Sequence, residues 1–362
     1  MSPTPDIPIP PDLARRHSRS ATGRAWLESL PRLISRCLAQ WQLEPDLAPG
    51  TLPWNGRGSL VVPVRQRAAA DGAWKAAVLK ISCPRDEAAL ERHALTLWAG
   101  NGAVRLMASD ALAGALLLER LDPGRSLLEL PLEKAIPVWG GLVRRLSLVP
   151  DLSPDGRPEW WAFDHVAARA EQWSDELPAA WEELARPFPR WLLEAALEVC
   201  QVRGAVGRRA GKDVLVHTDL HYLNVLGRPR TAEPGTAEPA WQEAAGAEDF
   251  AAIGPRPMIG EAEFAVAPLL WNRLRELDPS DPGGALLARC RDFSAAAGLD
   301  AETARQWSLA REVENALWYA SRREHEGDLA RSLWVASTLA GRTLPDLPAP
   351  RELPVSGGTV YR

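Results

Sequence analysis

The chain has 362 residues, of which 46% are hydrophobic and 25% are charged, so it is long enough for two lobes around a sizeable core. Its formal net charge of -5 argues against a nucleic-acid partner held by a basic surface, and no apolar run approaches the length of a membrane span. The N-terminus lacks a basic start followed by an apolar stretch, and the four cysteines lack CxxC spacing. We therefore expect a cytoplasmic protein with neither a zinc site nor a disulfide framework.

The first third of the chain predicts a small sheet with helices. The Pro-rich residues 1–20 predict disorder, and apolar residues at helical spacing predict a helix over 24–41. Two strands, a helix and two further strands are then expected at 60–64, 76–81, 86–99, 104–107 and 115–120. The residues Asp122, Pro123 and Gly124 end this pattern, which indicates a linker near position 121.

The rest of the chain is mainly helical in its periodicity. Helices are expected at 131–147, 162–174, 190–206, 264–277, 284–296, 301–323 and 327–340. Residues 231–247 predict a flexible insertion and residues 344–362 a loose tail. The plan is α+β, with a small lobe over 21–121 and a helical lobe over 122–343.

The strongest chemical signal is residues 214–226, Val-Leu-Val-His-Thr-Asp-Leu-His-Tyr-Leu-Asn-Val-Leu, which contain the H-x-D-x-x-x-x-N pattern of kinase catalytic loops. Asp219 can orient an acceptor hydroxyl and take its proton. Asn224, five residues later, can give its amide oxygen to Mg2+ on the nucleotide phosphates, while His217 braces the loop. The alternative is a surface loop that holds these residue types by coincidence.

Lys80 ends an apolar strand in a chain whose other lysines are only at positions 75, 134 and 212. This resembles the kinase strand whose lysine holds the α- and β-phosphates and pairs with a glutamate on the next helix, where Glu87 and Glu91 are both candidates. A surface lysine with solvated glutamates is the alternative. The turn Gly56-Arg57-Gly58-Ser59 either covers the phosphates or is a plain hairpin.

Several segments together resemble one family. The loop 217–226, Ile-Gly-Pro-Arg-Pro at 253–257, Leu-Leu-Trp-Asn at 269–272 and Leu-Leu-Leu-Glu-Arg-Leu-Asp-Pro-Gly at 116–124 are similar to the streptomycin and hydroxyurea branch of the aminoglycoside phosphotransferases. The resemblance spans about residues 25–340.

That resemblance implies a two-lobed protein-kinase-like fold, ATP and Mg2+ as cofactors, and a small-molecule substrate, with no nucleic-acid or membrane partner. It favours Glu91 as the partner of Lys80, and it makes the linker through Glu119 and Leu121 the segment whose main chain contacts adenine. It also implies that acidic residues of the second lobe attract cationic substrates. Glu312 and Glu314 are candidates for this role, although an acidic helix is usually a solvated face.

One position departs from the family pattern. The family reads Ile-Asp-Pro, with the principal metal-binding aspartate, where this chain has Gly254. Glycine has no side chain that could bind a metal ion. Loss of the aspartate ligand at a phosphoryl-transfer centre would slow the reaction on the order of a thousandfold. The carboxylates Glu248, Asp249, Glu261 and Glu263 are candidate substitutes. The rival hypothesis is a pseudokinase that binds nucleotide or metabolite without turnover.

Overall fold

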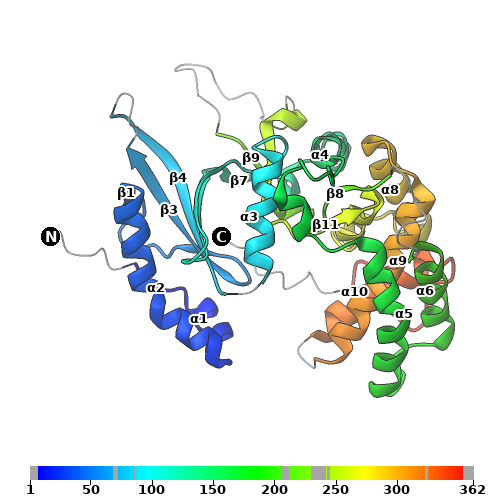
Figure 1. The fold of residues 1–362 in the computed structure, drawn as a ribbon. Helices are drawn as coiled ribbons and strands as arrows, with labels where there is room; N and C mark the ends of the chain where they lie inside the picture. The colour runs from blue at the N-terminus through cyan, green and yellow to red at the C-terminus, as the bar shows by residue number, and fades with distance from the viewer. Residues whose placement is uncertain are drawn as a thin grey trace.

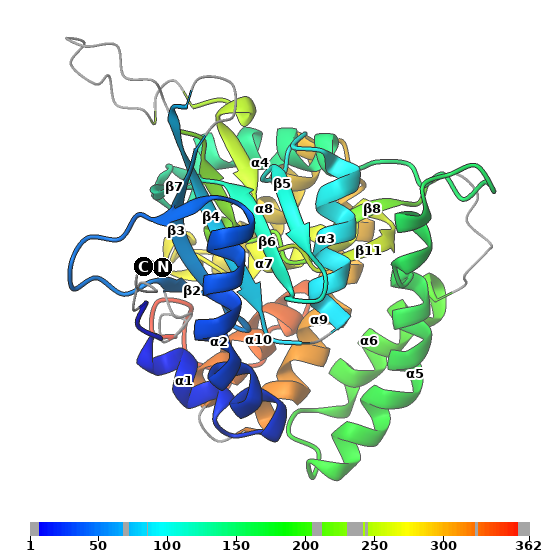
Figure 2. The same cartoon turned by 60° about the vertical axis from the view of Figure 1, so that its left-hand side comes forward.

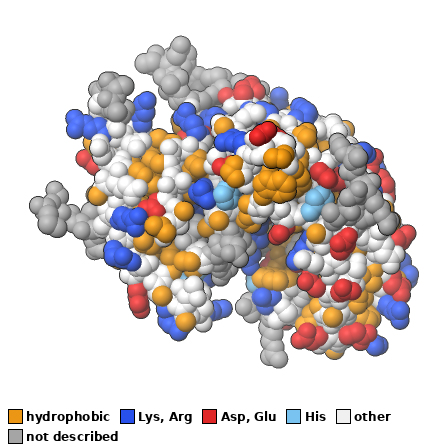
Figure 3. Space-filling model, viewed as in Figure 1, with side chains coloured by type: hydrophobic (Ala, Val, Ile, Leu, Met, Phe, Trp, Pro, Cys, Tyr) orange, Lys and Arg blue, Asp and Glu red, His pale blue; other side chains and the backbone are white. Residues whose placement is uncertain are grey.

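The structure is a computed structural model that describes residues 7–67, 72–84, 86–204, 212–229, 242, 245–322 and 325–353. Figure 1 shows two lobes, with the sheet of the N-terminal lobe on the left and the mainly helical lobe on the right. The space-filling view in Figure 3 shows a recess between them in the lower half of the same view. The expected α+β two-lobed fold is confirmed.

The N-terminal lobe is built on one antiparallel sheet with strand order β1-β3-β4-β6-β5, and β2 pairs with β3 at its side. The strands are β1 (Leu43–Pro45), β2 (Trp54–Asn55), β3 (Ser59–Arg67), β4 (Trp74–Ser82), β5 (Leu106–Asp110) and β6 (Ala115–Glu119), and the helices are α1 (Pro11–His17), α2 (Ala21–Gln40) and α3 (Asp86–Trp98). Figure 2 shows α2 and α3 on either side of this sheet.

Strand alternation explains why two helices cover the sheet. Leu79 and Leu117 pack with α2 in one apolar cluster, whereas Leu116 and Leu118 pack with the α3 residue Leu95 in the larger cluster that continues into the second lobe. Because successive side chains point to opposite faces, Lys80 lies on the face opposite Leu79, towards α3.

The second lobe is dominated by helices. These are α4 (Leu132–Leu146), α5 (Val166–Glu183), α6 (Arg190–Arg203), the short α7 (Ala267–Leu270), α8 (Pro282–Ala297), α9 (Ala301–Ala320) and α10 (Glu326–Leu339). Within it lie β7 (Asp122–Ser126), β8 (Val214–His217), β9 (Val225–Gly227), β10 (Phe250–Ala252) and β11 (Pro257–Gly260). They form one sheet of order β10-β9-β7 and the pair β11-β8.

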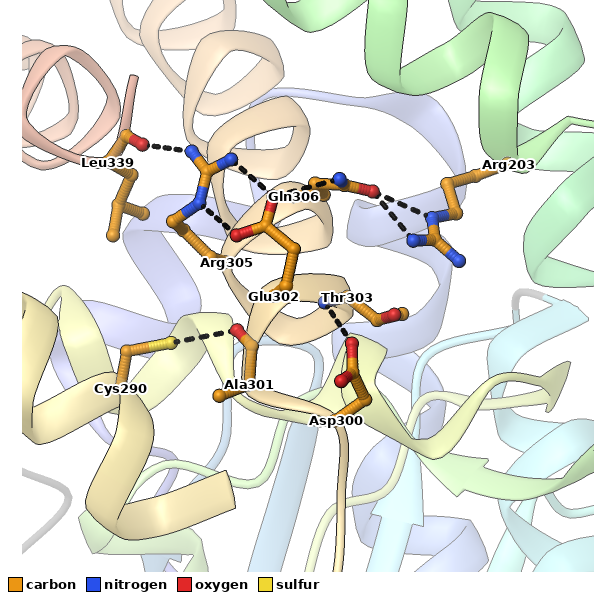
Figure 4. Close-up of polar contacts among 9 residues, drawn as sticks. All are labelled: Arg203, Cys290, Asp300, Ala301, Glu302, Thr303, Arg305, Gln306 and Leu339. Carbon is orange, nitrogen blue, oxygen red and sulfur yellow. Dashed lines mark hydrogen bonds and ion pairs between the residues drawn. The ribbon is translucent and has the colours of Figure 1, made fainter. Parts of the chain in front are cut away.

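Helix α9 begins at a well-defined cap, shown in Figure 4. The Asp300 side chain accepts a hydrogen bond from the backbone N–H of Thr303 at 2.7 Å, which satisfies one of the unpaired donors of the first turn. Arg305 pairs with Glu302 and also donates to the carbonyl of Leu339 at the end of α10. These contacts fix the helix whose later residues approach the catalytic loop.

Three expectations from the sequence are wrong. Residues 11–17 form α1 rather than a disordered start, because Leu13 is buried. The tail is not loose as far as residue 353, because Leu353 is buried in the core. The helix expected over 264–277 is reduced to α7 between short 3-10 turns, since Arg273 has a left-handed backbone with φ of 54°.

Two of the predictions concern segments that lie partly outside the described residues. Most of the insertion expected at 231–247 and the end of the expected tail lie outside them. Among the helices that the structure does describe, none combines the length and the apolar character needed to cross a membrane.

Candidate active site

Two loops lie side by side in the second lobe. The first, residues 218–224, joins β8 to β9, and the second, residues 253–256, joins β10 to β11. They are held side by side because β8 pairs with β11, with His217 opposite Pro257, and β9 pairs with β10, with Val225 opposite Ala252. Asp219 and Asn224 lie on the first loop, and Gly254 and Arg256 lie on the second.

Buried hydrogen bonds join these loops. His217 is only 2% exposed, and its Nε2 lies 3.1 Å from the carbonyl oxygen of Ile253, while its Nδ1 accepts a hydrogen bond from the backbone N–H of Asp219 at 3.3 Å. This pattern requires neutral imidazole with the proton on Nε2. Burial agrees with it, because desolvation lowers the pKa of His217 to about 4. The expected brace is thus a neutral histidine.

The carboxylate of Asp219 has two arginines nearby. The Nε of Arg256 lies 3.7 Å from Asp219 Oδ2. Burial lowers the pKa of Arg311 on α9, and the negative charge of Asp219 opposes that shift. Arg311 is held by a 3.0 Å hydrogen bond to the carbonyl of Phe264. The carboxylate therefore stands in positive surroundings.

Asn224 turns its amide oxygen towards Gly254. Its Nδ2 donates to the carbonyl oxygen of Asp219 at 2.8 Å, which fixes the orientation of the amide. A Cβ at Gly254 would lie 3.7 Å from Asn224 Oδ1. The glycine thus occupies the place from which a carboxylate would join Asn224 at a metal ion.

Lys80 and Glu91 form a tight pair across the sheet–helix boundary. The Lys80 ammonium lies 2.7 Å and 2.6 Å from the two carboxylate oxygens of Glu91, and the side chains are 16% and 7% exposed. The side chain of the other candidate, Glu87, lies outside the described residues. Both carboxylate oxygens are engaged, so the lysine is held in a fixed position.

Helix α3 connects this pair to the catalytic loop. Glu91 lies in its middle, and Trp98 at its C-terminal end stacks on His217 with ring centroids 6.1 Å apart and an 18° angle between the planes. The Trp98 indole also donates to the carbonyl of Leu146 at 2.8 Å. One rigid helix therefore fixes the Lys80 partner relative to the brace of the Asp219 loop.

The connection between the lobes follows β6. The Glu119 side chain accepts from the backbone N–H of Arg105 at 2.8 Å and pairs with Arg228 at 2.5 Å, and Leu121 is buried. The side chains of Glu119 and Leu121 are therefore engaged within the protein. The turn at Gly56 joins β2 to β3 as a hairpin, closed by a 2.8 Å hydrogen bond from Gly56 to the carbonyl of Ser59.

The residues present do not fit a two-ligand magnesium site of the family type. Asn224 is in place, but Glu261 is buried and is engaged by Arg203 at 3.2 Å and by Trp307 at 2.7 Å. Glu263 accepts from the backbone N–H of Asp300, and Asp249 from that of Gly246. Within the described part of the chain, no group of three His, Cys, Asp or Glu side chains could hold a metal ion.

The model of the aminoglycoside/hydroxyurea antibiotic resistance kinases matches residues 40–322. The chain belongs to this family. The expected enzyme class, a kinase that phosphorylates small molecules, is therefore confirmed.

Two relatives agree with the family model. The chain is 33% identical to a streptomycin 6-kinase of Streptomyces griseus over 88% of its length and 92% of that protein, and 34% identical to a hydroxyurea phosphotransferase of Kitasatospora aureofaciens over 93% and 87%. The solved structure of a choline kinase from Cryptosporidium parvum aligns with a TM-score of 0.49 at 11% identity, over 83% of this chain and 88% of that one.

The sequence motifs did not reveal three neighbours of the site. These are Arg256 beside Asp219, Arg311 from α9, and Trp98 stacked on His217. The flanking prolines of Arg256 are a signal that could have singled it out, since they indicate a rigid segment. For Trp98 and Arg311 the contacts join distant parts of the chain, so local spacing contains no signal.

Proposed function

We propose that this kinase transfers the γ-phosphate of ATP to a hydroxyl group of a small polar molecule, an aminoglycoside such as streptomycin or a related secondary metabolite. The acceptor oxygen attacks the γ-phosphorus, and its proton passes to Asp219. The bond between that phosphorus and the β–γ bridging oxygen breaks, and its electron pair leaves with ADP. The names of the relatives support the acceptor class.

The observation that carries this proposal is the bond network of α3. It holds Glu91 against Lys80 at 2.6 Å and also stacks Trp98 on His217, so the phosphate-binding cation and the acceptor-binding carboxylate are parts of one framework. Enzymes catalyse phosphoryl transfer mainly by holding the reacting groups in such a fixed geometry. In this account Lys80 binds the α- and β-phosphates, and the main chain from Glu119 to Leu121 contacts the adenine.

This chain offers magnesium fewer side-chain ligands than the family pattern does. Asn224 is the one side chain of the expected pair that offers an oxygen, because position 254 is glycine. We assign no step of the reaction to the metal ion.

A second candidate function is binding of nucleotide without efficient turnover. The specific observation in its favour is again Gly254, which faces Asn224 Oδ1 without a carboxylate. In this case the Lys80–Glu91 pair would still hold phosphates, but transfer would be slow.

The experiment is transfer of labelled γ-phosphate from ATP to a panel of aminoglycosides and to hydroxyurea, with wild type and Asp219→Asn compared. Asp219→Asn preserves the shape of the side chain but removes the base, so transfer should fall by about a hundredfold or more while nucleotide binding is retained. Nucleotide binding without transfer to any acceptor would favour the second candidate. Full activity of Asp219→Asn would refute the role of this residue.

A further inference from the structure

Arg256 lies on a segment with little backbone freedom. It stands between Pro255 and Pro257, whose rings fix φ, and a residue before proline is itself restricted to extended conformations. Its carbonyl oxygen accepts hydrogen bonds from Thr218, from the hydroxyl at 2.6 Å and from the backbone N–H at 3.3 Å. Thr218 precedes Asp219 directly, so the backbone of Arg256 is fixed beside the catalytic carboxylate.

The side chain of Arg256 is held much less firmly than its backbone. Its Nε lies 3.7 Å from Asp219 Oδ2, beyond the distance of a good hydrogen bond, and the two side chains are 48% and 33% exposed. Ion pairs this exposed contribute little to stability. The guanidinium can therefore turn from the carboxylate to another nearby anion at small cost.

The charge at this centre favours such a turn. Position 254 has no carboxylate, and Glu261, Glu263 and Asp249 are engaged elsewhere. A kinase centre normally neutralises the phosphate charge with metal ions held by carboxylates. A guanidinium can do the same for a phosphate through two parallel hydrogen bonds, and it stays charged at every physiological pH.

We propose that Arg256 binds the γ-phosphate of the nucleotide and supplies positive charge that the Gly254 position cannot recruit through a metal ion. This inference rests on the proposed function, because it needs ATP in the recess. It makes Arg256 a phosphate-binding residue of the same reaction, and it predicts that the site holds ATP with little help from Mg2+.

Calorimetric titration of the protein with ATP and with ADP tests the proposal, because it measures affinity. EDTA removes Mg2+, so the measurement does not depend on turnover. The variants are Arg256→Gln, which removes the charge, and Arg256→Lys, which keeps it. Because only ATP has a γ-phosphate, Arg256→Gln should weaken ATP binding by about tenfold or more and ADP binding by less than about twofold. Arg256→Lys should retain most of the ATP affinity. Arg65→Gln is the matched control, since Arg65 forms a similarly exposed pair with Glu44 far from the loops.

The outcomes separate this inference from the proposed function. If wild type binds ATP and Arg256→Gln binds it equally well, the inference is refuted and the proposed function stands. Equal losses for ATP and ADP would also refute it, because they indicate a general electrostatic effect. If wild type binds neither nucleotide in EDTA but binds ATP once Mg2+ is added, the inference is refuted and the proposed function stands. If wild type binds neither nucleotide even with Mg2+, both the inference and the proposed function fail.

Discussion

Removal of one member of the Lys80–Glu91 pair should destabilise the protein. Glu91 is 7% exposed, so removal of its partner leaves a buried carboxylate without a cation. Lys80→Met should weaken ATP binding by tenfold or more, about 1.4 kcal/mol, because the α- and β-phosphates lose their cation. Equilibrium titration with ATP measures this effect. Lys134→Met, at an exposed position, is the control, and equal ATP affinities of the two variants would contradict the assignment.

Gly254 can accept a larger side chain. Its φ of 60° lies in the left-handed region, which aspartate and asparagine tolerate better than most residues. A Cβ there would meet only the Asn224 amide, at ordinary contact distance. A carboxylate placed at this position would therefore share its surroundings with Asn224 Oδ1, which makes Gly254→Asp a fair test of the missing ligand.

At the scale of elements, the β8–β9 and β10–β11 loops depend on a neutral histidine. The pKa of His217 is about 4 in the folded chain and about 6.5 in the unfolded chain, so the unfolded state takes up a proton first as the pH falls. The contribution of His217 to the free energy of unfolding should therefore fall by about 3 kcal/mol between about pH 6.5 and pH 4 and stay level below that window.

Comparison with His217→Gln isolates this contribution. In urea unfolding between pH 4 and 7, the free energy of unfolding of wild type relative to the variant should fall by about 3 kcal/mol as the pH falls. The comparison of two proteins is needed because Glu312 acts in the opposite sense. Burial raises its pKa to about 7, so its contribution to stability is lost as the pH rises from about 4.5 to 7. Parallel curves for wild type and His217→Gln would contradict the account.

The elements differ in how far the sequence predicts them. The H-x-D-x-x-x-x-N pattern is local, so its loop between β8 and β9 could be recognised from spacing. Lys80 could be found because a charged residue interrupts an apolar strand. The helix predicted over 264–277 was wrong. The apolar residues of this region suit a helix, but the left-handed backbone of Arg273 interrupts it. The contact of Arg256 with Asp219 depends on strand pairing between β8 and β11, which no local pattern specifies.

At the scale of the whole molecule, a contact of Arg57 joins the β2–β3 hairpin to the second lobe. The Arg57 guanidinium lies 5.1 Å from the ring centroid of Trp318 on α9, and the Arg57 carbonyl lies 3.3 Å from Nε2 of His17 on α1. The contact thus holds the β2–β3 turn against α9. A cation over a half-buried tryptophan such as Trp318 contributes about 0.5–1 kcal/mol.

Loss of this contact should loosen the turn and leave the fold intact. In Arg57→Ala, the amide of Gly56, which bonds to Ser59, should exchange with deuterium about two to five times faster. Mass-spectrometric hydrogen exchange measures this. Arg342→Ala, which breaks a similar contact with Trp191, should leave the turn unchanged. Unchanged exchange at the turn in Arg57→Ala would show that the contact does not restrain the hairpin.

In the proposed kinase site, one metal-binding carboxylate of the family pattern is missing, because position 254 is glycine. The direct measurement is ATP turnover as a function of Mg2+ concentration for wild type, Gly254→Asp and the uncharged control Gly254→Asn. Wild type and Gly254→Asn should be slow and respond weakly to Mg2+, and Gly254→Asp should be faster by about tenfold or more, with a strict requirement for Mg2+. Fast, Mg2+-dependent wild-type turnover that Gly254→Asp leaves unchanged would contradict the account.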